Sequence, residues 1–262
     1  MYASLMPNLS RLTLFAALLP AACAVAPDLV PVSAYGPAAL GAVRYKAVLV
    51  AGDGSLPVFD NAVDAMADRL RRGGRTTGIT RLSAAPAMIA QEGVRSASLD
   101  YILSAVGDMR PGPGEGCLVF ATSHGAPRTG LSLSLTREAL SPEALDRALV
   151  RGCGNAPTVV VASGCFSGVY AQAPMARPNR VILTAARPDR TSFGCGAGFT
   201  YTVYDRCLLD SLDSAVTWRD VSGAVGGCVA SEERRQRVTP SEPQASFGEA
   251  VAGLPAPGRA AP

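Results

Sequence analysis

The sequence predicts an α/β domain built on a mostly parallel sheet with helices on both faces. Short, continuous apolar runs alternate along the chain with longer stretches that carry apolar residues at helical spacing. Continuous apolar runs are typical of strands that are buried on both faces of a parallel sheet. Right-handed crossovers between such strands place the connecting helices on both sides. The 262 residues leave room for one sizeable domain or two small ones.

The predicted elements follow one another in a regular order. The first strand is an apolar run that ends at a Gly-Asp-Gly turn, and the helix after it carries Val63, Met66 and Leu70 on one face. Ser141 and Pro142 open a later helix, because serine is a preferred N-cap and proline suits the first turn. The expected strands are residues 46–51, 79–82, 117–121, 158–162 and 180–185. The expected helices are residues 58–72, 98–106, 141–152, 201–212 and 218–229, with a small hairpin arm at 131–135.

Both ends of the chain differ in composition from this core. Residues 1–26 contain Arg11, then an apolar run, then small residues, which is typical of a secretory signal. We therefore expect an exported protein, periplasmic or in the cell envelope. A second interpretation ends the signal before Cys23 and attaches a lipid there. The remaining predicted divisions are a Pro/Gly/Ala-rich linker at 27–43, one domain at 44–239 and a flexible tail at 240–262.

Composition excludes several classes of partner. The net charge of +3 is small and the arginines are scattered, so no nucleic-acid surface is expected. After the N-terminal segment, no apolar run reaches the roughly 18 residues that a membrane span requires. With a single histidine and no closely spaced cysteine pair, the chain predicts neither a zinc site nor any other metal or cofactor site.

Seven cysteines are present, and an exported protein is free to pair some of them. If Cys165 is a free nucleophile and Cys23 lies in the signal, an odd number remains. We expect Cys117, in a buried strand, to be unpaired. Up to two bridges would then form among Cys153, Cys195, Cys207 and Cys228, in an order that sequence leaves open. A bridge to Cys165 itself is the alternative, and it would abolish nucleophilicity.

Two candidate catalytic residues follow strands. His124 comes shortly after the strand at 117–121, and Cys165 comes shortly after the strand at 158–162. Ligands of parallel α/β sheets bind beyond the carboxyl ends of the strands, so both residues are expected at that edge. A cysteine attacks as its thiolate and needs a nearby base, and His124 is the only histidine. The backbone N–H groups of Gly125 and Cys165 could stabilise an oxyanion.

The order of His124 and Cys165 and the residues after Cys165 argue against three other classes of hydrolase. In α/β-hydrolases and papain-like enzymes the nucleophile precedes the histidine, whereas here the histidine comes first. Residues 166–172 contain no arginine, although a cysteine phosphatase needs one to clamp the phosphate. A caspase-type arrangement remains.

Four segments in order resemble the legumain family of cysteine peptidases, family C13 of the caspase-like clan. They are an apolar strand ending in Val-Ala-Gly at 50–52, a strand leading to His-Gly at 118–125, a strand leading to Gly-Cys-Phe-Ser-Gly at 159–168, and the segment 184–195. The resemblance spans residues 45–210. It implies a three-layer caspase-like fold with His124 as general base and acid, Cys165 as nucleophile, and Gly125 and Cys165 as oxyanion donors. It also implies that Thr191 and Ser192 line a substrate pocket.

The chain departs from the family pattern at four residues. Ser123 stands where legumains usually have the aspartate tied to transpeptidation, and Gly164 replaces a more common alanine. Asp60 and Asn61 stand where legumains carry Arg-His in their asparagine-selective pocket. We therefore expect asparagine specificity not to transfer, and Asp60 is a candidate substrate-binding residue that could favour a basic side chain.

These observations predict a cysteine endopeptidase that cleaves peptide or protein substrates through a Cys-His dyad and a thioester acyl-enzyme. Two alternatives remain at this point. One is a transamidase or transpeptidase using the same dyad. The other is a non-catalytic envelope protein that uses the fold as a binding scaffold.

Overall fold

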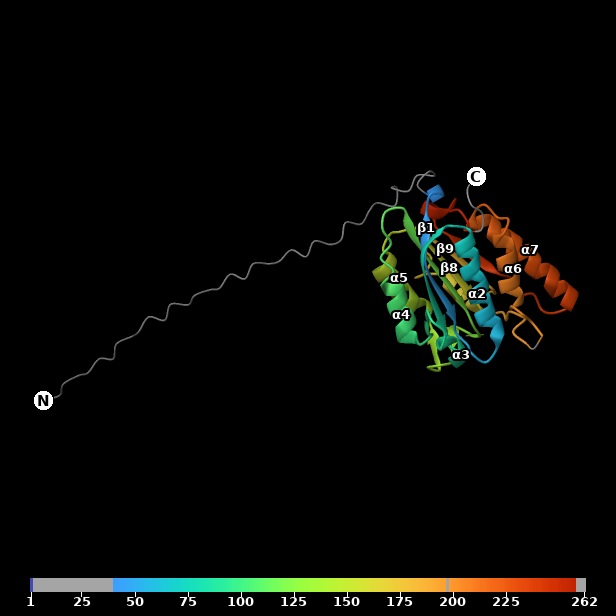
Figure 1. Cartoon of the computed structure of the whole chain (residues 1–262), viewed down its shortest axis with the longest axis horizontal. Coiled ribbons are helices and arrows are strands. Elements are labelled where there is room, and N and C mark those ends of the chain that lie inside the picture. The colour runs from blue at the N-terminus through green and yellow to red at the C-terminus, as the bar shows by residue number, and fades with distance from the viewer. Residues whose placement is uncertain (2–39, 197, 258–262) are drawn as a thin grey trace.

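The computed structural model describes residues 1, 40–196 and 198–257, and the ranges 40–196 and 198–257 form a three-layer α/β domain (Figure 1). The predicted signal segment beyond Met1, the candidate lipid site Cys23 and most of the predicted linker lie outside these ranges. Within the described ranges, none of the helices combines the length and apolar character that a lipid bilayer span demands.

The central sheet has seven strands in the order β10-β9-β8-β4-β1-β2-β3. All neighbours in it are parallel except β10, which is antiparallel to β9. Its strands are β1 (Arg44–Ala51), β2 (Thr76–Ser83), β3 (Val94–Ser96), β4 (Glu115–Thr122), β8 (Thr158–Ser163), β9 (Arg180–Thr184) and β10 (Gln244–Phe247). A small antiparallel sheet consists of β5 (Gly125–Ala126), β6 (Gly130–Leu133) and β7 (Glu138–Leu140).

Helices cover both faces of the sheet, as the alternation of elements predicts. In Figure 1, α4 and α5 lie on one side, and α2, α6 and α7 lie on the other. The helices are α2 (Pro57–Arg72), α3 (Pro86–Ile89), α4 (Leu99–Gly107), α5 (Pro142–Cys153), α6 (Val203–Leu212) and α7 (Trp218–Gln236), with 3-10 turns η2 (Ser167–Ala171) and η3 (Glu249–Val251). The Ser141 hydroxyl caps α5 by accepting a hydrogen bond from the Ala144 N–H at 3.2 Å, as predicted.

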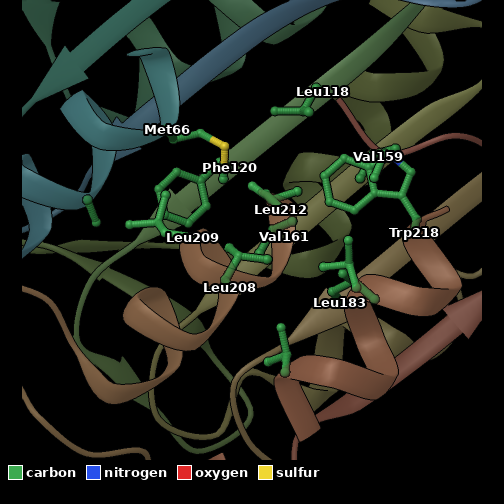
Figure 2. Packing of buried hydrophobic residues seen from close by; sticks show 14 of the residues in the cluster. Met66, Leu118, Phe120, Val159, Val161, Leu183, Leu208, Leu209, Leu212 and Trp218 are labelled. Atoms are coloured by element: carbon green, nitrogen blue, oxygen red, sulfur yellow. The ribbon is translucent and has the colours of Figure 1, made fainter. Parts of the chain in front are cut away.

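Each face of the sheet has its own apolar core, because side chains along a strand alternate between the two faces. Figure 2 shows the core under α2, α6 and α7, where residues of β4, β8 and β9 meet Leu208, Leu209 and Leu212 of α6. A second core lies under α4 and α5. The strands between two cores are almost wholly buried, which explains their continuous apolar sequence.

The prediction of a flexible tail at residues 240–262 is wrong for part of that range. Residues 244–247 form β10, which pairs with β9 at one edge of the sheet. Leu254 packs in the core, and its carbonyl accepts a hydrogen bond from the backbone N–H of Trp218 at 3.0 Å. A Pro- and Ala-rich composition pointed to a tail, but the antiparallel edge position tolerates short strands of low apolar content.

One of the two disulfides differs from the expectation, whereas the other is among the pairings expected. Cys117 bonds to Cys153, joining β4 to the last residue of α5, and Cys207 bonds to Cys228, joining α6 to α7. Cys165 and Cys195 are the free cysteines of the described residues. Burial in a strand therefore did not leave Cys117 unpaired, because α5 brings Cys153 onto the same face of the sheet.

Candidate active site

His124 and Cys165 lie at the carboxyl ends of two neighbouring strands. β4 and β8 pair in parallel register, with Thr122 opposite Ser163. Each strand ends there, and each candidate catalytic residue follows two positions later. The two residues line a common hollow together with Ser192. The structure thus brings the sequence-predicted pair to one edge of the sheet.

The turn that carries Cys165 is set by its neighbours. A Cβ on Gly164 would stand 2.6 Å from the Ser123 carbonyl oxygen, closer than real Cβ contacts. Only glycine therefore lets the β8 turn pass the β4 turn. Phe166 adopts a left-handed conformation with φ 59°, and its N–H donates to the Arg190 carbonyl at 2.7 Å. These constraints hold the backbone on both sides of Cys165.

Gly125 lies directly against the Cys165 backbone. A Cβ on Gly125 would stand 2.0 Å from the Cys165 carbonyl oxygen and 3.2 Å from its nitrogen. The absence of a side chain is thus required for this approach. It places the two residues expected to donate oxyanion N–H groups next to each other.

The Cys165 sulfur faces the backbone of Ser192. The Ser192 N–H donates to Sγ at 3.3 Å, and Sγ lies 3.6 Å from the Ser192 carbonyl oxygen. Burial raises the pKa of the Cys165 thiol and outweighs the Ser192 N–H, which lowers it, while Cys195 nearby raises it further. The resting sulfur is therefore a thiol at neutral pH, and attack requires a base.

His124 is half-buried and fixed on two sides. Its carbonyl accepts a hydrogen bond from the Ser132 N–H at 2.7 Å, which joins it to the small sheet. Its ring meets the Phe59 ring edge to face, with centroids 5.3 Å apart and planes at 76°. Phe59 belongs to α2 and is 1% exposed, so it is a rigid support for the imidazole.

The three residues expected to bind substrate, Asp60, Thr191 and Ser192, do not line one common hollow. Ser192 lines the hollow of His124 and Cys165, whereas Thr191 is exposed and is not among its lining residues. Asp60 lies instead in a second hollow of about 250 Å³ with Asn61 and Asp64. It is 6% exposed, and burial raises its pKa. The dyad and Asp60 thus line different hollows.

Two lining residues had no sequence signal that marked them as part of the site: Phe59 and Thr202. Each comes from a segment distant in sequence from both strand ends. The hollow holds about 20 Å³, room for roughly one water molecule. Within the described residues, no three histidine, cysteine or acidic side chains gather as metal ligands would.

The fold is that of the caspases. The structure matches caspase-1 from Spodoptera frugiperda with a TM-score of 0.55 and 13% identity, covering 79% of this chain and 87% of that one. It matches pro-sf-caspase-1 with a TM-score of 0.54 and 13% identity, covering 78% and 91%. These similarities show a caspase-like α/β fold.

The sequence narrows this class further. The model of the peptidase C13 family matches residues 108–221, a range that contains His124 and Cys165. This similarity to family C13 supports a cysteine peptidase-type function. No curated protein matches the sequence.

Proposed function

We propose that the protein is a cysteine endopeptidase that cleaves peptide bonds with His124 as base and Cys165 as nucleophile. The observation that carries this proposal is the common hollow at the ends of β4 and β8, which both side chains line. The close approach of Gly125 to the Cys165 backbone supports an oxyanion site beside the sulfur.

In the proposed reaction, His124 removes the thiol proton as Cys165 Sγ attacks the substrate carbonyl carbon. The negative oxygen that forms is stabilised by the N–H groups of Gly125 and Cys165. The tetrahedral intermediate collapses to a thioester, and His124 gives its proton to the leaving amine. Water then attacks the thioester with His124 as base, releasing the acid and the free thiol. A base is needed because burial raises the thiol pKa.

For substrate selection we propose that the acidic hollow of Asp60 receives a basic side chain. Asp60 and Asp64 both line it, and Asp60 directly follows Phe59, whose ring contacts His124. A library of fluorogenic peptides varied at each position tests this. Enrichment of Arg or Lys that is lost in Asp60→Asn is expected, and a library without preference for either would contradict it.

We also propose that the protein works in an oxidising compartment, as an exported protein would. Two disulfides within the described domain support this, since structural disulfides are rare in the cytosol of most organisms. Fractionation of cells that express the full chain, with immunodetection of each fraction, tests the location. Recovery only from the cytosol would contradict it.

Labelling with a peptidyl acyloxymethylketone tests the dyad directly. The reagent should modify Cys165 in the folded protein, and peptide mapping should locate the adduct there. His124→Ala should slow the labelling by at least about 100-fold, the usual contribution of a general acid-base residue. Cys195→Ala is the matched control, because Cys195 lines the same hollow but has no part in the proposed reaction; since Cys195 raises the pKa of Cys165, its removal should not slow the labelling. Labelling equally fast in His124→Ala would favour a binding scaffold.

A further inference from the structure

Beneath the hollow lies an acidic residue that the proposed reaction does not use. Asp205 belongs to the first turn of α6 and is 0% exposed. Its N–H donates to the Thr202 hydroxyl at 3.0 Å, so its backbone is fixed by the helix cap. Two residues around it, Ser163 and Thr202, line the hollow of the dyad.

The Asp205 carboxyl faces the ends of both strands that carry the dyad. The Thr122 hydroxyl, at the end of β4, donates to Asp205 Oδ2 at 2.7 Å. Burial raises the pKa of the Asp205 carboxyl, and the nearby hydroxyls of Thr122, of Ser163 at the end of β8 and of Thr202 offset part of this rise. Oδ1 forms no hydrogen bond of normal geometry within the described residues, so the Ser163 contact is looser than the Thr122 contact.

Thr122 and Ser163 occupy equivalent positions. They are partners in the β4–β8 ladder and point to the same face, where α6 packs. Each stands two residues before one member of the dyad. Asp205 is thus hydrogen-bonded to the end of β4 through Thr122 and lies close to the end of β8 at Ser163.

The presence of an acid at this place calls for an explanation beyond packing. A buried carboxyl loses its hydration, and the described residues offer Asp205 no ion pair in return. By contrast Asp146, the other deeply placed aspartate of an α-helix on the opposite face, forms ion pairs with Arg177 and Arg180. A group that costs stability and joins two catalytic strands points to a role in the site.

We propose that Asp205 is a positioning residue that holds the ends of β4 and β8 together and thereby keeps His124 within reach of Cys165. This inference rests on the proposed Cys-His dyad. It assigns Asp205 no contact with substrate. Its effect is the alignment of the two side chains, in addition to the backbone pairing that already joins β4 to β8.

The test measures how strongly His124 activates Cys165, using iodoacetamide as the probe. The alkylation rates of Cys165 and Cys195 are followed in the same molecules by peptide mass spectrometry, and their ratio is the readout. In the wild-type background, His124→Ala should lower this ratio at least about tenfold. We call this fall in the ratio of the Cys165 to the Cys195 alkylation rate the His124 effect. In the Asp205→Ala background, the same substitution should lower the ratio less than about twofold, because the pair is already misaligned.

Asp205→Asn should restore the full His124 effect, because an amide can accept from Thr122 and donate toward Ser163. A merely structural role would not make the His124 effect disappear in Asp205→Ala and return in Asp205→Asn. Asp146→Ala is the control for lost stability. It should destabilise the domain but leave the His124 effect intact. If Asp205→Ala does not fold, Thr122→Val carries the test, since it removes one link while keeping a strand-forming side chain. It should then reduce the His124 effect.

The possible failures are distinguishable. A full His124 effect in folded Asp205→Ala, or in Thr122→Val, would overturn the positioning role while leaving the proposed peptidase intact. Absence of any His124 effect in the wild-type background would overturn the proposed dyad, and the positioning role with it.

Discussion

Gly125 and Cys165 are in backbone contact, although 40 residues separate them in the sequence. The contact exists because β4 and β8 are neighbours in the sheet and both turns leave it at the same edge. A Cβ at position 125 would lie 2.0 Å from the Cys165 carbonyl oxygen, so the turn has no room for any side chain.

Gly125→Ala should therefore abolish most of the activity. The alanine must displace the Cys165 backbone, which removes oxyanion stabilisation, and the loss of one such donor lowers turnover about 10²–10³-fold. Peptidase assays combined with thermal unfolding would measure this. Gly223→Ala is the control, because that glycine lies in α7 with open space around its Cβ position. Activity within a few fold of wild type in Gly125→Ala would contradict the assignment.

The Phe59 ring should contribute to the orientation of His124. Phe59→Leu removes the edge-to-face contact but keeps an apolar side chain, so it should cost about 1–2 kcal/mol of stability, less than the roughly 3–5 kcal/mol of a Phe→Ala change. Turnover should fall by more than this stability loss explains. Phe120→Leu is the matched control, since Phe120 is buried in the same core and makes no ring contact with His124 among the described residues. Equal turnover in the two variants would show that Phe59 acts only in packing.

The thiol of Cys165 should titrate above the ordinary range of cysteine when His124 is absent. Burial raises its pKa, so at a given pH less thiolate is present than in an exposed cysteine, whose pKa is about 8.5. In His124→Ala, alkylation of Cys165 by iodoacetamide should still be rising with pH beyond about pH 9. The rate at each pH is measured by peptide mass spectrometry, with glutathione as the reference thiol. A plateau below about pH 8 would mean that another group stabilises the thiolate.

The two disulfides should each stabilise the domain. They close loops with sequence separations of 36 and 21 residues, for which the chain-entropy estimate is about 3–4 kcal/mol each. Replacing Cys117 and Cys153 together by alanine, or Cys207 and Cys228 together, should lower the free energy of unfolding by up to that amount in denaturant titrations. Non-reducing peptide mapping checks the pairing. A bridge that contains Cys195 would contradict it.

The local features of the site follow from sequence alone. Continuous apolar runs predicted β4 and β8, and the observed strands extend the predicted ranges by at most two residues at either end. Because parallel strands end at a common edge, the chain order of strands and turns is enough to place His124 and Cys165 together. The same reasoning could not identify Phe59, since an apolar helix residue that supports a histidine looks like any other core residue.

Misassignments arose where the answer depended on contacts between distant segments. The pairing of Cys117 with Cys153 depends on how α5 lies across β4, and the edge strand β10 depends on an unpaired edge of β9. Asp60 is a different case: it was chosen from its position in a family pattern, it lines another hollow than the dyad, and its role in substrate binding stays a prediction.

The sequence by itself thus determined the α/β class, the order of the catalytic candidates and their common edge, because strand periodicity and crossover handedness are local properties of the chain. Only the tertiary structure decided which cysteines pair, that Ser192 contacts the Cys165 sulfur, and that Asp205 reaches Thr122 across 83 residues. Those contacts arise when helices pack on a sheet, and the burial and distance that define them exist only after packing.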